Sequence, residues 1–131
     1  MLKVYQFGLS KKEGDLVNSK GWNASPKTEA YLGKYKGYQE GTGQYYTYVA
    51  NVQSNELEEA FHLMNAWNDL DKVECYRDET GFAPHIYSMS VGDVVEKDGE
   101  FYSCEPMGFA KINPNEYDSF PTQENYATGN A

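Results

Sequence analysis

The stretch that decides the fold is "SMSVGDVVEKDGEFYSCEPMGF", which runs from Ser88 to Phe109. Its segment "VGDVVEK" predicts a strand, and "EFYSC" predicts a second strand that returns beside it. Between them stands Asp98-Gly99, a dipeptide typical of two-residue hairpin turns, in which both positions require a positive φ. After Pro106-Met107, "GFAKI" predicts a last strand. The stretch therefore predicts consecutive strands of a small antiparallel sheet.

The polar residues of this stretch fit local structural roles. Ser90 or Asp93 can accept hydrogen bonds from nearby backbone N–H groups where the chain turns into the strand, and Gly92 permits a positive φ. The alternative is catalytic, with acid–base roles for Asp93, Glu96, Asp98, Glu100 and His85. Because exposed acids often flank turns in soluble sheets, we expect these residues to be structural.

The segment "SNELEEAFHLMNAWNDL" predicts the main helix. Its first turn is acidic, which suits the positive end of the helix dipole. An apolar stripe follows at helical spacing, formed by Leu57, Ala60, Phe61, Met64 and Trp67. We expect this stripe to pack on the sheet, with Phe61 and Trp67 against Tyr102 and Phe109.

The first half of the chain is harder to interpret. "LKVYQF", residues 2–7, predicts an opening strand, whereas residues 8–37 mix Gly, Ser, Asn, Pro and Lys and predict a long irregular segment with Trp22 plugging the core. Residues 35–53, "YKGYQEGTGQYYTYVANVQ", predict a hairpin that turns at Gly41 and Gly43. Alternation along its second strand places Tyr46, Tyr48, Ala50 and Val52 on one side.

Together these elements predict an α+β fold, a small curved antiparallel sheet of about five to six strands with one main α-helix packed on it. Residues 1–112 form a single domain in this interpretation, and the polar residues 113–131 form an extended or disordered tail.

Charge is divided unevenly along the 131 residues. The net charge is −9, but residues 1–48 carry seven lysines and four acids, whereas residues 49–131 carry sixteen acids and four basic residues. An acidic surface repels nucleic acid and membranes. We therefore expect a partner protein with a basic surface, which could itself bind nucleic acid, and no direct contact with nucleic acid or membrane.

Other classes of protein lack support in the sequence. No run is long and apolar enough for a membrane span or a signal peptide, so we expect a cytoplasmic protein. Cys75 and Cys104 match no disulfide framework, metal or redox spacing, and the two histidines form no metal motif. No cofactor, metal site or enzymatic activity is therefore expected.

The pattern S-x-S-V-G-D-V-V, an acidic-Gly turn, an aromatic return strand and G-F resembles the YodL-like small domains of bacterial, phage and plasmid proteins. The resemblance spans about residues 44–112 and lies in Ser88, Ser90, Val91, Gly92, Asp93, Val94, Gly99, Tyr102, Gly108 and Phe109. Some members are encoded near antirestriction and conjugation functions. The resemblance thus implies a phage or mobile-element accessory protein, in the host cytoplasm if phage-encoded, and it supplies no catalytic residue.

Three functions are consistent with these observations. The favoured one is a binding module that modulates a host protein, as an antirestriction or defence inhibitor does. The second is a nucleotide-binding sequestering protein or small hydrolase acting on a defence signal, in which Trp22 and tyrosines stack a base while Arg77, Lys34 and Lys36 hold phosphate. The third is a virion or assembly accessory protein, and homo-oligomers remain open.

The candidate binding residues cluster around the motif in this interpretation. They are Trp67, Arg77, His85, Asp93, Tyr102 and Phe109.

Overall fold

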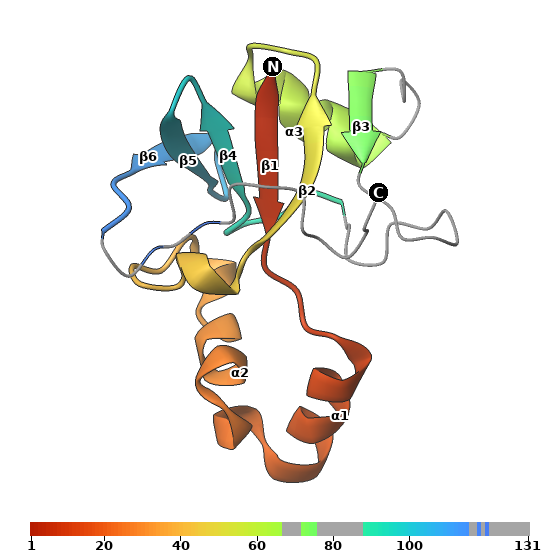
Figure 1. The fold of residues 1–131 in the computed structure, drawn as a ribbon, viewed down its shortest axis with the longest axis vertical. Coiled ribbons are helices and arrows are strands. Elements are labelled where there is room, and N and C mark those ends of the chain that lie inside the picture. The colour runs from red at the N-terminus through yellow and green to blue at the C-terminus, as the bar shows by residue number, and fades with distance from the viewer. Residues whose placement is uncertain (67–71, 76–87, 116–117, 119, 121–131) are drawn as a thin grey trace.

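A six-stranded antiparallel sheet forms the centre of the molecule (Figure 1). The computed structural model describes residues 1–66, 72–75, 88–115, 118 and 120. The strands, in the order β3-β2-β1-β4-β5-β6, are β1 (Leu2–Gln6), β2 (Thr47–Val52), β3 (Val73–Cys75), β4 (Val94–Lys97), β5 (Glu100–Cys104) and β6 (Phe109–Ile112). The predicted α+β class is confirmed.

The β4–β5 hairpin turns as the sequence predicts. Asp98 and Gly99 have φ angles of 52° and 82°, so both central residues adopt the positive φ that a tight turn between twisted strands requires. β4 pairs with β5 from Val94↔Ser103 to Lys97↔Glu100, and β6 continues the sheet from Cys104↔Phe109. Short-range turn chemistry therefore defines this half of the sheet.

Helix α3 (Leu57–Ala66) covers one face of the sheet. Ala60, Leu63 and Met64 are buried there against an aliphatic core that includes Leu2, Val4, Ala50, Val52, Val95 and Cys104. The predicted stripe is correct for Ala60 and Met64 but wrong for Phe61, which is 40% exposed. The helix is rotated so that Leu63 takes the buried position, and Trp67 lies outside the described residues.

The other face carries an aromatic core. Its buried residues are Tyr5, Phe7, Tyr46, Tyr48, Val94 and Phe120. Phe120 stacks on Phe101, with ring centroids 4.9 Å apart, and meets Tyr5 at 5.2 Å. The buried Asp118 accepts the backbone N–H groups of Gly41 and Gly43 at 3.0 Å. Prediction of a tail from residue 113 is therefore wrong for the part that the structure describes, because Asp118 and Phe120 belong to the domain.

A bulge in β2 explains how one strand serves both cores. Val4 pairs with Ala50 but the next residue, Tyr5, pairs with Tyr48, so Val49 has no partner on β1. The extra residue reverses the alternation, and Tyr48 joins the aromatic core while Ala50 joins the aliphatic one. The prediction that Tyr46, Tyr48, Ala50 and Val52 share a side is wrong for this reason, and both faces of the strand are covered.

Residues 8–37 are not an irregular segment. They form α1 (Lys11–Lys20) and α2 (Pro26–Tyr31), each begun by a capping box, Ser10 with Glu13 and Ser25 with Thr28. Glu13 also bridges to Lys27 at 3.0 Å, which ties the two helices together. In Figure 1 they project from the sheet. We call residues 8–36 the helical arm.

The predicted hairpin over residues 35–53 is wrong as well. Only β2 is a strand there; the preceding residues form 3₁₀ turns at Lys34–Lys36 and Gly43–Tyr45. Tyr38 lies in the connecting loop, where its ring contacts Tyr46 and Phe120. The segment therefore covers the aromatic face and adds no strand to the sheet.

Candidate binding surfaces

Asp93 organises the turn that leads into β4. Its Oδ2 accepts the Ser90 N–H at 2.9 Å, and its own N–H donates to Ser90 O at 3.0 Å. Gly92, with a φ of 90°, donates its N–H to Cys104 O at 2.8 Å. The local roles predicted for Asp93 and Gly92 are confirmed.

Lys34 completes this turn from the base of the helical arm. Its ammonium lies 2.8 Å from Asp93 Oδ1, and the two side chains are 11% and 2% exposed. Gln6 Nε2 donates to the other carboxylate oxygen at 3.0 Å. Burial raises the pKa of Asp93, and the Lys34 ammonium and the hydrogen-bond donors offset this only in part. Asp93 thus anchors the arm to the sheet and faces no open site.

Tyr102 and Phe109 lie apart from this anchor. Phe109 packs on the aliphatic core beneath α3, as expected. The Tyr102 hydroxyl donates to Glu100 at 3.0 Å at the surface. The expected packing of both residues against Phe61 is wrong, because Phe61 turns to solvent.

Three of the six predicted binding residues, Asp93, Tyr102 and Phe109, lie in the described part of the chain. No hydrogen bond or ion pair of the described chain joins Asp93 to Tyr102 or Phe109. Trp67, Arg77 and His85 lie outside the described residues.

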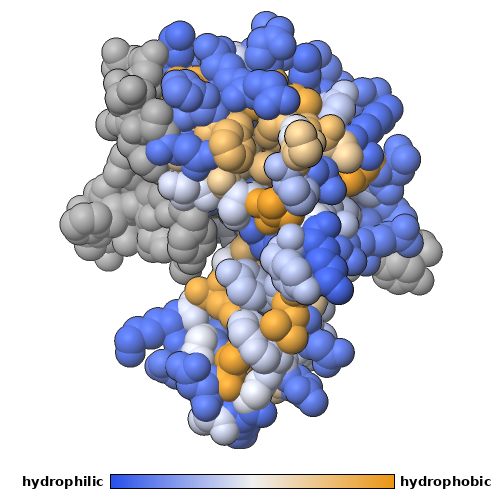
Figure 2. All heavy atoms as spheres, turned by 180° about the vertical axis from the view of Figure 1, so that it is seen from behind, coloured by the Kyte–Doolittle hydropathy of each residue, from blue (hydrophilic) through white to orange (hydrophobic). Residues whose placement is uncertain are grey.

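A different site lies beside the anchor, between the arm and the residues before β4. It is a cleft of about 410 Å³ lined by Trp22, Tyr31, Leu32, Lys34, Tyr35, Ser90 and Val91, which we call the aromatic cleft. Trp22 is 37% exposed and Tyr35 is 69% exposed, so Trp22 does not plug the core. Figure 2 shows apolar residues on the surface of the arm among hydrophilic ones.

Sequence reasoning named Trp22, tyrosines and Lys34 for a nucleotide site but did not place Ser90 and Val91 beside them. The residues of the cleft come from three short segments with no hydrophobic periodicity, and Lys34 joins the arm to Ser90 and Val91. The one local signal was the presence of three aromatic residues, Trp22, Tyr31 and Tyr35, within a lysine-containing stretch.

Exposed carboxylates occupy two places on the part of the molecule that holds the sheet and α3. Glu56, Glu58 and Glu59 are exposed at the start of α3, and Asp98 and Glu100 are exposed at the β4–β5 turn. The pairing Lys3↔Glu96 places that turn near Met1, whose ammonium donates to Asn55 at 3.2 Å just before α3. We call these five carboxylates the acidic end, and Figure 1 shows the arm at the other end of β1.

Within the acidic end, Glu100 alone is paired in the described structure. Lys111 lies 3.1 Å from its Oε1 and is the main reason that its pKa is lowered. The other four carboxylates make no ion pair with a described residue. This part of the surface therefore keeps a net negative charge.

The described residues offer no metal site, and the Cys104 thiol is buried. The described residues contain no group of three His, Cys, Asp or Glu side chains that could hold a metal ion. Burial raises the pKa of the Cys104 thiol to about 11, so the thiol is neutral and inert as a nucleophile near pH 7. No described helix has the length and apolar character needed to cross a membrane.

Comparisons of the chain with protein-family models, with curated proteins and with solved structures found no match.

Proposed function

We propose that the protein is a YodL-like accessory protein of a phage or mobile element that binds and modulates a host protein, as an antirestriction or defence inhibitor does. Its acidic end is the surface that meets a basic region of the partner. The observation that carries this proposal is the set of five exposed carboxylates, at the start of α3 and at the β4–β5 turn, of which only Glu100 pairs with a described cation.

Charge separation within the molecule supports this surface. The helical arm carries Lys11, Lys12, Lys20, Lys27, Lys34 and Lys36. In Figure 1, α1 and α2 project away from the β4–β5 turn, so the lysines of these two helices are separated from the carboxylates of that turn. A surface of one sign steers a partner of the opposite sign and speeds their association.

The arrangement favours a partner that itself binds nucleic acid. Carboxylates spaced along one end of a rigid sheet offer such a protein fixed negative charges in place of phosphates. Because the turn residues Asp98 and Gly99 and the first turn of α3 are held by backbone geometry, little order is lost on binding.

The test is affinity capture from host lysate with three immobilised proteins. The first is the wild type, and the second is the E58K/E59K/D98K variant. The third, D15K/E29K/E40K, makes the same change in net charge at exposed acids outside the acidic end. At about 0.15 M salt we expect the wild type and the D15K/E29K/E40K variant to capture the same host protein. The E58K/E59K/D98K variant should not capture it.

The captured protein is then purified and its affinity measured against salt. We expect the affinity to fall steeply as salt rises. The acidic end would be rejected as the binding surface if the E58K/E59K/D98K and D15K/E29K/E40K variants captured the host protein equally, or if the affinity did not change with salt.

A further inference from the structure

We propose that the aromatic cleft binds a nucleotide, whose base packs on Trp22 and Tyr35 and whose phosphate faces Lys36. This site is separate from the acidic end, so the inference does not rest on the proposed function.

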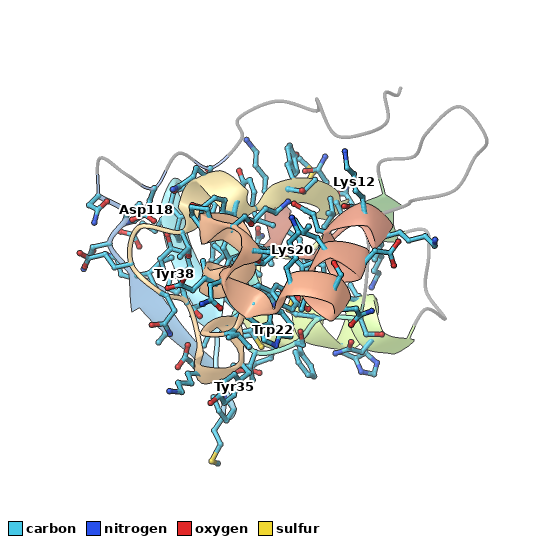
Figure 3. The ribbon with its side chains drawn as sticks, turned by 90° about the horizontal axis from the view of Figure 1, so that it is seen from below. Lys12, Lys20, Trp22, Tyr35, Tyr38 and Asp118 are labelled. Atoms are coloured by element: carbon cyan, nitrogen blue, oxygen red, sulfur yellow. The ribbon has the colours of Figure 1, made fainter. Side chains whose placement is uncertain are left out.

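The shape and lining of the cleft suit a planar ring. Its volume of about 410 Å³ lies within the range of small-ligand sites. The rings of Trp22 and Tyr31 are nearly parallel, with an interplanar angle of 13° and centroids 6.1 Å apart. Figure 3 shows Trp22 and Tyr35 near each other on the arm, with Lys12 away from both. Exposed ring faces of this kind stack bases of any sequence.

Lys34 is not available to the ligand, contrary to the expectation that it holds phosphate. Its ammonium has three N–H donors and three acceptors, Asp93 Oδ1 at 2.8 Å, Val91 O at 3.1 Å and Ser90 Oγ at 3.3 Å. The floor of the cleft is therefore electrically balanced. Ser90 still has its hydroxyl proton to donate to a base edge.

Lys36 supplies a positive charge beside Tyr35, one of the residues that line the cleft. Its Nζ lies 5.6 Å from the centre of the Tyr35 ring, and it makes no ion pair with a described carboxylate. A positive charge beside exposed rings favours a ligand that joins an aromatic ring to an anion. It disfavours a cationic ligand, which the rings alone would also accept.

A single nucleotide fits these features better than a nucleic-acid strand. A strand requires a continuous basic groove, whereas the described cleft lining contains only Lys34 as a charged residue, and Lys34 is already paired. The net charge of −9 also repels a long polyanion more than it repels one phosphate group.

The test measures binding of AMP, adenosine, inorganic phosphate and a single-stranded oligonucleotide to the full chain by calorimetry. Fluorescence gives a second signal. Because the chain has two tryptophans, Trp22 and Trp67, the Trp67→Phe variant is used so that the emission comes from Trp22 alone. We expect AMP to bind more tightly than adenosine, and phosphate alone not to bind detectably. Trp22→Ala and Tyr35→Ala should each weaken AMP about tenfold or more.

Lys36→Glu tests the contact with the phosphate separately from the contact with the base. It should weaken AMP and leave adenosine unchanged, whereas Lys12→Glu, an equal charge change away from the cleft, should leave both unchanged. Both lysines are exposed, so the variants should fold. The proposal is overturned if AMP does not bind, if the Trp22 and Tyr35 variants bind it normally, or if the oligonucleotide binds more tightly than AMP. The E58K/E59K/D98K variant should bind AMP normally, which separates failure here from failure at the acidic end.

Discussion

Lys34 and Asp93 come from opposite halves of the chain and meet as a buried ion pair, with Nζ and Oδ1 2.8 Å apart. The pair joins the base of the helical arm to the start of β4, and it also holds Ser90 and Val91 against the arm. The pair and the packing of Tyr31 on Phe7 together place the aromatic cleft.

Breaking one side of the pair should destabilise the fold strongly. Asp93→Ala leaves the Lys34 ammonium buried without its carboxylate, and we expect a loss of about 3–5 kcal/mol in the free energy of unfolding. The double variant Lys34→Met with Asp93→Leu removes both charges and should recover much of that loss. Urea denaturation of Lys34→Met, Asp93→Leu and the double variant gives the coupling energy. Additive effects would show that the pair does not act as a unit.

Gly92 and Gly99 form a matched pair for testing the anchor. Both have a positive φ, 90° and 82°, but a Cβ on Gly92 would lie 2.4 Å from Lys34 O, whereas one on Gly99 meets open space. Gly99→Ala should cost about 1–2 kcal/mol from backbone strain alone. Gly92→Ala adds a steric clash and should cost about 3 kcal/mol or more. Thermal unfolding measures both, and equal losses would contradict the close approach of Lys34.

Phe120 should contribute as much to the free energy of unfolding as a buried residue within the sheet. Its ring packs between Tyr5, Tyr46 and Phe101 at centroid distances of 4.9–5.3 Å. Phe120→Ala should lower the free energy of unfolding by about 3 kcal/mol. Met107→Ala, at a side chain that is 92% exposed, should change it by less than about 0.5 kcal/mol. If chemical denaturation gave the two variants similar stabilities, Phe120 would not be part of the core.

Alkaline pH should destabilise the protein through Cys104. Burial, aided by the negative charge of Asp93, raises the pKa of the thiol from 9.0 to about 11. Since the fold favours the neutral thiol, its contribution to stability is complete below pH 9 and is lost as the pH rises towards 11. Stability should therefore fall more steeply across this range in the wild type than in Cys104→Ala, by up to about 1.4 kcal/mol per pH unit.

Tyr46 provides the internal control for this comparison. Burial raises its pKa as well, and it is present in both proteins, so the difference between their pH profiles isolates the thiol. Parallel profiles from urea titrations at each pH would show that the Cys104 thiol is not destabilised when charged.

The sequence predicts the elements whose signals are local. The hairpin of β4 and β5 follows from Asp98-Gly99 and from the strand propensity beside it, and α3 follows from its acidic start and apolar stripe. These signals involve residues a few positions apart, so they can be recognised in the sequence without any knowledge of the fold.

Longer-range features are not predictable in the same way. Helix α1 buries no residue, so it lacks the apolar stripe on which helix prediction depends, and only the Ser10–Glu13 capping box marks it. The anchor between Lys34 and Asp93, and the return of Phe120 to Tyr5, depend on the folded chain. The aromatic cleft lies between the arm and the residues before β4, and the sequence predicted a site around the motif instead, because this contact forms only in the folded chain.

Val49, which has no partner on β1, separates the residues of β2 that belong to the two cores. Residues of β2 before it contribute to the aromatic core under the arm, and those after it contribute to the aliphatic core under α3. Sequence changes on one side of this residue therefore need not be matched on the other. A substitution in the aromatic core acts on the side of the sheet that Tyr31 packs against, whereas one in the aliphatic core acts beneath α3.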